Sequence, residues 1–192
     1  MTNPLRILSS WIEDAANAGD AEPSAMALAT ATRDGMPSCR IVLCRGVGDH
    51  SLKFFTSYES PKGIELGENA AVAATFYWGC LARQVRVVGT AARLPASESD
   101  AYFLEQRPRG HRLQSWASRQ STVIGSLDEV RARHLEFEKQ FEGQIVPRPD
   151  YWGGFEITVN SVELWTSGGD RLHERRYFTR EGDNWHERLL SP

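Results

Sequence analysis

The residues best suited to chemistry lie near the end of the chain, in the segment Arg171-Leu172-His173-Glu174-Arg175. If this segment is a β-strand, alternate side chains share a face, so Arg171, His173 and Arg175 lie together. Two guanidinium groups and one imidazole can bind an anion and handle a proton. A solvent-exposed polar face of an edge strand would have the same pattern, and spacing alone favours neither interpretation.

Basic residues in the first third of the chain indicate a phosphate ligand. Arg40 and Arg45 flank the apolar run Ile41-Val42-Leu43. Lys62 falls in the first turn of an expected short helix, where backbone N–H groups already favour a phosphate. Together these cations could bind one or two phosphate groups.

A second set of candidate residues has stronger structural alternatives. Arg107 and Arg109 are expected to close a helix, where compensation of the helix dipole is the simpler explanation. Phe55, Trp116 and Trp165 could cover a flat ring, although such aromatics are more often part of a core.

Metal and acyl-transfer chemistry have no support in the sequence. It contains no H-E-x-x-H motif, no Cys/His cluster, no G-x-S-x-G elbow, no G-x-G-x-x-G fingerprint and no P-loop. Cys39 and Cys44 are separated by an odd number of positions on one expected strand, so they should point to opposite faces as small buried residues. With Cys80 unpaired, a disulfide framework is improbable, and a reducing, cytoplasmic compartment is expected.

The composition is that of an ordinary soluble domain. Of 192 residues, 41% are hydrophobic and 24% are charged, and the formal net charge is −3. This balance provides no basic field for nucleic acid, and the stretch Arg107–Arg112 lacks interleaved aromatics. The longest apolar run, Ala70–Ala82, is interrupted by Thr75 and Gly79, so no membrane span is expected. The N-terminus lacks a basic region followed by an apolar core, so no signal peptide is expected.

The elements that would position these residues are mostly strands in hairpins. Helices are expected over Pro4–Ala18, from Ser60 to about Asn69, from Ser97 (with Asp100 as a capping box) to about Gln106, and from Ser126 to Gly143. Strands are expected over Met26–Thr32, Ser38–Arg45, Leu52–Thr56, Ala71–Trp78, Gln84–Leu94, Phe155–Trp165, Arg171–Thr179 and Trp185–Leu190. The predicted fold is mainly β with peripheral helices, built on an antiparallel sheet or barrel.

Taken in order along the chain, several segments resemble the pyridoxamine/pyridoxine 5′-phosphate oxidase family. Each motif is weak alone, but their order extends from about Pro4 to Pro192. The segments are Ala25-Met26-Ala27-Leu28-Ala29-Thr30, Arg40-Ile41-Val42-Leu43, Phe54-Phe55-Thr56, Arg83-Gln84-Val85, Arg107-Pro108-Arg109-Gly110, Trp116-Ala117-Ser118-Arg119-Gln120-Ser121, Tyr151-Trp152-Gly153-Gly154 and Arg171-Leu172-His173-Glu174-Arg175.

The resemblance implies a single FMN-binding split β-barrel domain over residues 1–192. Its parts would be a helix (4–18), a barrel core (25–95), a helical insertion (97–143) and C-terminal strands (155–190). It also implies a homodimer with FMN at the interface and a small aromatic substrate, without nucleic acid, membrane or metal. The family's N-terminal segment, which helps to cover the substrate, is expected to be mostly missing.

Carried over by position, one subunit would contribute much of the FMN site. These residues would be Arg40, Ile41, Val42, Leu43, Cys44, Arg45, Phe55, Thr56 and Lys62. The site would be completed by Gln84, Gln120, Ser121, Trp165 and Arg175. The family usually has a basic residue directly before this lysine, where the chain has Pro61, so one phosphate contact is expected to be lost.

The substrate pocket departs further from the family pattern. The family's phosphate-binding lysine corresponds to Arg45, its arginine to Arg107 and its serine to His111. Spacing from Arg107 puts the family's tyrosine at Phe103, although Tyr102 is adjacent and a one-residue insertion would restore it. Arg45 can still bind phosphate, and His111 can donate a hydrogen bond.

The implied reaction is hydride transfer from the substrate C4′ carbon to flavin N5, followed by reoxidation by O₂. Arg171 and His173 would lie against the substrate ring as catalytic residues, and they would also contribute to substrate binding. The altered pocket leaves an alternative open: the similar phenazine-biosynthesis oxidases, which act on a larger carboxylated ring. A non-enzymatic carrier or sensor of FMN or pyridoxal phosphate is a third possibility, disfavoured because a carrier would not need both Arg171 and His173.

Overall fold

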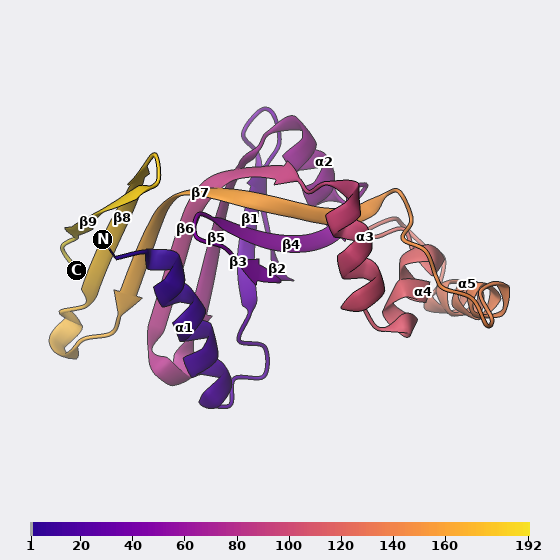
Figure 1. Cartoon of the computed structure of the whole chain (residues 1–192), viewed down its shortest axis with the longest axis horizontal. Coiled ribbons are helices and arrows are strands. Elements are labelled where there is room, and N and C mark those ends of the chain that lie inside the picture. Colours follow the sequence, from indigo (N-terminus) through magenta and orange to yellow (C-terminus); the bar gives the residue numbers. More distant parts are fainter. Residues whose placement is uncertain (1) are drawn as a thin grey trace.

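An antiparallel sheet that curls into a half-barrel forms the body of the molecule (Figure 1). The computed structural model describes residues 2–192, and within them nine strands have the order β2-β1-β5-β6-β7-β4-β3, with β8 and β9 continuing from β7. The strands are β1 (Ala25–Ala31), β2 (Pro37–Leu43), β3 (Gly46–Val47), β4 (Ser51–Ser57), β5 (Ala71–Trp78), β6 (Arg83–Arg93), β7 (Trp152–Thr166), β8 (Glu174–Glu181) and β9 (Asn184–Leu189). This confirms the expectation of a mainly β fold with peripheral helices.

Five α-helices within the described residues surround or extend the sheet. They are α1 (Pro4–Asn17), α2 (Pro61–Glu68), α3 (Ala96–Glu105), α4 (Arg109–Ala117) and α5 (Leu127–Gln140). Helix α1 lies near the β8–β9 end, whereas α3, α4 and α5 project beyond the sheet at the opposite end (Figure 1). The expected caps are present on α2 and α5, where the side chains of Ser60 and Ser126 accept hydrogen bonds from the helix.

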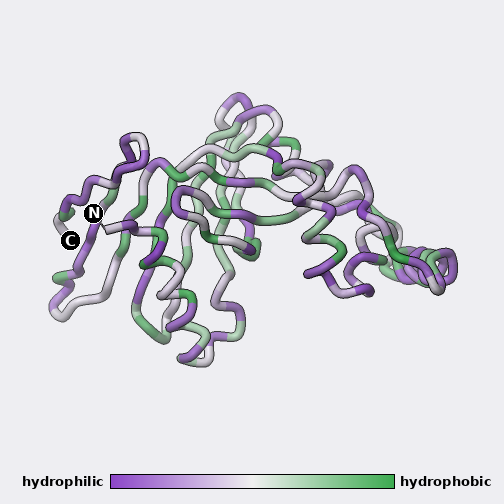
Figure 2. Tube along the Cα trace, in the orientation of Figure 1, coloured by the Kyte–Doolittle hydropathy of each residue, from purple (hydrophilic) through white to green (hydrophobic). Residues whose placement is uncertain are grey.

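The main hydrophobic core joins the buried face of α1 to residues of the sheet. Alternate residues of β1 and β5 are buried, including Met26, Leu28, Phe76 and Trp78. Figure 2 shows hydrophobic residues along the central strands and hydrophilic residues at the β1–β2 turn. Buried and exposed side chains therefore alternate along these strands with the period of two that the sequence predicted.

Strand β7 organises the molecule because its two halves pair with different neighbours. Residues 152–158 pair with β4, whereas residues 161–166 pair with β8, and β6 runs alongside both halves. The register on β6 shifts between Val88 and Gly89, where a Cβ on Gly89 would lie 2.2 Å from the Thr158 carbonyl oxygen. At about 3.3 Å per residue, the path along β7 from Gly154 to Trp165 spans roughly 35 Å.

Three predictions about local structure were wrong. Strand β8 begins at Glu174, and Gly169–Arg171 forms a 3-10 turn in which Arg171 has φ 63°, so Arg171 and His173 do not alternate on a strand. Arg109 begins the unpredicted helix α4 and does not close another helix. The capping box at Ser97 is absent, because α3 starts after Pro95 without a side-chain cap.

The structure also tests the expected burial of two cysteines and the expected absence of a membrane span. Cys44 is buried, but Cys39 is exposed, so the prediction of a buried small residue holds only for Cys44. None of the helices in residues 2–192 combines the length and apolar character needed to cross a bilayer.

Candidate functional site

A cavity of about 400 Å³ opens among β2, β4, α2 and α3. It is lined by Arg40, Ile41, Val42, Leu43, Arg45, Phe55, Thr56, Lys62, Tyr102, Arg107 and Gln120. Two adjoining hollows share several of these residues; one adds Ser121, and the other, of about 770 Å³, adds Cys44 and His111. The structure therefore brings most of the predicted FMN and substrate residues together.

Lys62 is a buried cation without an anionic partner. Its residue is 6% exposed, and its Nζ donates to Thr56 Oγ1 at 3.1 Å and to Ser60 Oγ at 3.2 Å. No salt bridge among the described residues involves this ammonium group. Burial, together with the charge of Arg40, lowers the pKa of Lys62, while Glu65 opposes the shift. A phosphate would supply the missing counter-charge.

The start of α2 holds Lys62 in place. Ser60 caps the helix and Pro61 occupies its first position, where no backbone N–H is needed. Gly63 lets this turn lie directly against the end of β4, since a Cβ there would lie 2.5 Å from the Tyr58 carbonyl oxygen. A larger residue at position 63 would therefore displace the turn that carries Lys62.

Arg40 lines the cavity together with Lys62, and a second pair of cations, Arg45 and Arg107, lines the same cavity. Arg107 donates from Nε to the His111 carbonyl oxygen at 3.1 Å and from Nη2 to Ser115 Oγ at 3.1 Å. Its guanidinium lies 4.7 Å from the centre of the Trp152 ring. Burial and the nearby charge of Arg45 lower the pKa of Arg107. Both cation pairs would therefore be stabilised by an anionic ligand.

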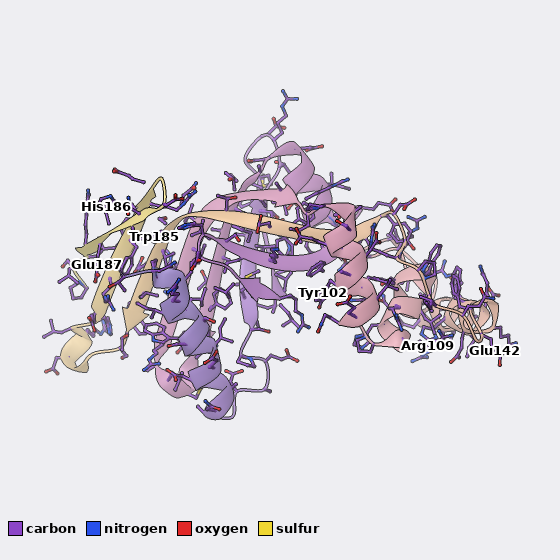
Figure 3. The ribbon with its side chains drawn as sticks, in the orientation of Figure 1. Tyr102, Arg109, Glu142, Trp185, His186 and Glu187 are labelled. Carbon is purple, nitrogen blue, oxygen red and sulfur yellow. The ribbon has the colours of Figure 1, made fainter. Side chains whose placement is uncertain are left out.

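An aromatic wall lies beside these cations. The rings of Phe55 and Tyr102 stack with centroids 3.7 Å apart and planes at 8°, and Phe55 also stacks on Trp152 at 5.8 Å. Figure 3 shows Tyr102 on α3, facing the sheet. A flat ring could bind against such a surface.

Phe103 requires a correction. It is fully buried and packs edge-on against Trp152 at 5.1 Å, whereas Tyr102 lines the cavity. Ser99 and Phe103, four residues apart, share the buried face of α3, so helical periodicity could have directed Phe103 inward and Tyr102 toward the site. Sequence reasoning also missed Trp152 and Glu65 as neighbours of the site.

The remaining predicted residues form a second group at the far end of β7. Gln84, Trp165 and Arg175 are register partners across β6, β7 and β8, and the rings of Trp165 and His173 lie 4.8 Å apart. The backbone N–H of Gly168 donates to His173 Nδ1 at 3.3 Å. Arg175 Nε donates to the buried carboxylate of Glu163 at 2.8 Å.

Within one chain, the two groups do not line a common cavity. The cavity and its two adjoining hollows are lined by none of the second group, which comprises Gln84, Trp165, Arg171, His173 and Arg175. Figure 3 shows Trp185, on the neighbouring β9, near the left end of the molecule and Tyr102, on α3, right of its centre. Across the described part of the chain, no group of three His, Cys, Asp or Glu residues is arranged to hold a metal ion.

Comparison with known proteins gives consistent matches over the whole chain. The family model described as pyridoxamine 5′-phosphate oxidase matches residues 12–141, and the model described as the pyridoxine 5′-phosphate oxidase C-terminal dimerisation region matches residues 152–192. The pyridoxine/pyridoxamine 5′-phosphate oxidase of Rubrobacter xylanophilus is 47% identical over 99% of this chain and 87% of the relative. That of Leptospira biflexa is 41% identical over 99% of this chain and 89% of the relative.

Two solved structures are similar in fold. PhzG from Burkholderia lata, solved with tetrahydrophenazine-1-carboxylic acid, has a TM-score of 0.93 and 32% identity, over 100% of this chain and 94% of that one. A pyridoxamine 5′-phosphate oxidase-related, FMN-binding protein from Nostoc punctiforme has a TM-score of 0.80 over the full length of both chains. At 16% identity, this second similarity concerns the fold alone.

Proposed function

The chain belongs to the pyridoxamine 5′-phosphate oxidase family, and from this premise we propose that it is an FMN-dependent oxidase that converts pyridoxine or pyridoxamine 5′-phosphate to pyridoxal 5′-phosphate, with O₂ as the electron acceptor. One observation carries the proposal: two pairs of cations, Arg40 with Lys62 and Arg45 with Arg107, line one cavity beside an aromatic wall. The cofactor and the substrate each combine a flat ring with a phosphate. Two phosphates need two sets of cationic donors.

The residues around Lys62 fit the phosphate of FMN. The buried ammonium lacks a carboxylate partner, and it lies in the first turn of α2, where the helix dipole favours an anion. The edge of β2 at Ile41–Leu43, with Phe55 and Thr56, would line the flavin ring, and Gln120 and Ser121 would complete this half. FMN held here would supply the hydride acceptor of the reaction, with O₂ as the final electron acceptor.

The residues around Arg107 fit the substrate. Arg45 and Arg107 would bind its phosphate, with His111 at the edge of the larger hollow. Tyr102 would place its ring and hydroxyl beside the substrate, since it lines both the cavity and this hollow. Fixing a phosphate and a ring at once orients the C4′ carbon and excludes unphosphorylated analogues.

The second group of residues would come from a second copy of the chain. Within one chain the two groups line no common cavity, and the path between them along β7 is roughly 35 Å. The match of residues 152–192 to a dimerisation region supports a homodimer that joins them. In that dimer, the second copy would supply Gln84, Trp165, Arg171, His173 and Arg175 to the cavity of the first.

His173 would act by donating a hydrogen bond to the substrate. Because the Gly168 N–H donates to Nδ1, the neutral imidazole carries its proton on Nε2. It would therefore orient the oxygen or nitrogen on C4′ and would not abstract a proton in this tautomer. Arg171, exposed on its tight turn, would hold the substrate in position while C4′ gives up its hydride.

The phosphate requirement tests this proposal. We expect kcat/KM for pyridoxine 5′-phosphate to exceed that for pyridoxine by at least about 100-fold, because charge-assisted contacts are lost with the phosphate. Arg107→Met should remove most of this preference, with Arg109→Met, exposed and outside the cavity, as the matched control. Equal turnover of both substrates by the wild-type protein would refute the proposal.

A second candidate function has one specific observation in its favour. Arg45, Arg107 and His111 lie around a hollow of about 770 Å³, large enough for a carboxylated tricyclic compound. The similar PhzG structure contains tetrahydrophenazine-1-carboxylic acid. If that compound reduced the bound flavin and pyridoxine 5′-phosphate did not, this second function would replace the first.

A further inference from the structure

A carboxylate, Glu65, joins the elements that carry the first pair of cations. It lies on α2, one turn after Lys62, and its side chain is 12% exposed. Its Oε2 accepts hydrogen bonds from Ser38 Oγ on β2 at 2.6 Å and from Thr30 Oγ1 on β1, and lies 3.4 Å from Arg40 Nη2. One carboxylate oxygen therefore connects α2, β1 and β2 beside the cavity.

The directions of these hydrogen bonds hold the guanidinium of Arg40 in one orientation. A hydroxyl carries a single proton, and Thr30 and Ser38 both donate theirs to Glu65. Their lone pairs remain free to accept from Arg40, whose Nη1 contacts Thr30 and whose Nη2 contacts Ser38. Nη1 also donates to the Leu28 carbonyl oxygen at 3.3 Å. Arg40 is thus fixed along one edge while it lines the cavity.

The charges around Glu65 reinforce this arrangement. Arg40 and Lys62 are like charges, and Glu65 opposes the effect of Arg40 on the pKa of Lys62. Burial alone would raise the pKa of Glu65, but hydrogen bonds from Ser38 and Thr30 and the charge of Arg40 outweigh it and hold this pKa below its usual range. Glu65 is therefore ionised at neutral pH and stabilises two neighbouring cations before a ligand binds.

We propose that Glu65 is a positioning residue that holds Arg40 beside Lys62, so that both cations meet one phosphate group of a bound cofactor. The inference rests on the proposed function, in which that cofactor is FMN. The inference predicts that loss of Glu65 weakens phosphate binding, whereas charge alone predicts stronger binding. Removing a carboxylate near a phosphate site should strengthen binding by charge alone, whereas loss of the arrangement of Arg40 should weaken it.

Binding of FMN and riboflavin to the flavin-free full-length chain separates these effects, because riboflavin lacks the phosphate. Dissociation constants would be measured from quenching of flavin fluorescence. Glu65→Ala should raise Kd for FMN about tenfold, which is about 1.4 kcal/mol, and change Kd for riboflavin less than about twofold. Glu65→Gln, which keeps an acceptor for the hydroxyls, should have a smaller effect. Glu68→Ala, exposed on the same helix, is the control and should change neither.

A double-mutant cycle tests whether Glu65 acts through Arg40. Arg40→Ala should weaken FMN binding, and adding Glu65→Ala to it should weaken binding little further. Unchanged or tighter FMN binding in Glu65→Ala, with Arg40→Ala weakened, would overturn the inference and leave the proposed function standing. Equal weakening of FMN and riboflavin would mean a structural role only and would also overturn it.

Two further outcomes are decisive. If Arg40→Ala binds FMN as tightly as the wild type, the cofactor phosphate is not at this position, and both the proposed function and the inference fail. If thermal unfolding shows that Glu65→Ala does not fold, Glu65→Gln is judged by the same ratio of FMN to riboflavin affinity, with a preferential loss for FMN expected.

Discussion

Two nearly inactive variants should restore activity when their chains are allowed to pair. Arg107→Met alters the group near α3, and Arg171→Met alters the group beyond the end of β7. These groups are separated by roughly 35 Å of strand. Loss of one cation that binds an anionic substrate costs about 3 kcal/mol, so each variant alone should keep about 1% of the wild-type kcat/KM.

The expected recovery follows from the symmetry of a dimer in which each site uses both copies. In a mixed dimer, one site combines the two intact groups, and the other combines the two altered groups. Random pairing of equal amounts makes about half of the dimers mixed, so about 25% of all sites should be intact. The assay is formation of pyridoxal 5′-phosphate below KM, after the two chains are co-expressed or refolded together.

A second mixture provides the matched control. Wild-type chains paired with the double variant Arg107→Met/Arg171→Met should also give about 25% if sites are shared between copies, but about 50% if each chain holds a complete site. Recovery that stays near 1% in the first mixture, together with about 50% in the second, would refute the shared site.

Three further predictions concern single residues. Lys62→Met should raise the melting temperature of the flavin-free protein by a few degrees near neutral pH, since burial and a neighbouring guanidinium lower the pKa of Lys62 and make its charged form costly in the folded state. This advantage should shrink as pH rises toward the ordinary lysine pKa of about 10.4, and calorimetry across pH would measure it; an advantage that grows with pH would contradict the reasoning. Gly63→Ala should cost about 1–3 kcal/mol in urea unfolding and weaken FMN binding, because its Cβ would lie 2.5 Å from the Tyr58 carbonyl oxygen; a wild-type midpoint would be the contrary result. Tyr102→Phe should lower kcat/KM with little change in stability, whereas Phe103→Tyr should lose about 1–3 kcal/mol of stability by burying an unpaired hydroxyl; the reverse pattern would place Phe103 in the site.

Much of the sheet could be predicted because each strand has one buried face. Period-two alternation in β1 and β5 matched their burial, and β5 was predicted with its observed bounds. The start of α2 was also predictable, since Ser60-Pro61 is both a cap and a helix start, and this placed Lys62 in a first turn. Alternation along a strand and a capping residue at a helix start were enough to predict elements whose boundaries depend on neighbouring residues in the sequence.

The segment around Arg171 could not be predicted by alternation, because a tight turn interrupts it. Asp170 and Arg171 both have positive φ, which non-glycine residues rarely adopt, and this delays β8 until Glu174. Helix α4 was missed because no side chain caps its start, so the usual cap signal is absent from the sequence. Neither the turn at Arg171 nor the start of α4 leaves a mark in the alternation of polar and apolar residues.

The division of the site into two groups was beyond any argument from spacing. Resemblance placed Phe55 and Trp165 near one flavin, and within the chain they lie toward opposite ends of β7. Only the pairing of β7 with β4 in one half and with β8 in the other reveals the distance. The contact between Glu65 and Arg40 likewise depends on how α2 packs over β1 and β2.

Anaerobic titration of the FMN-loaded protein with pyridoxine 5′-phosphate tests the central claim most directly. Flavin absorbance near 450 nm would be followed as substrate is added. The account predicts that about one equivalent per bound FMN bleaches the oxidised flavin, because the substrate phosphate seats at Arg45 and Arg107 and brings C4′ to the ring. Flavin that is bound but stays oxidised at excess substrate would contradict the assignment of this cavity to pyridoxine 5′-phosphate.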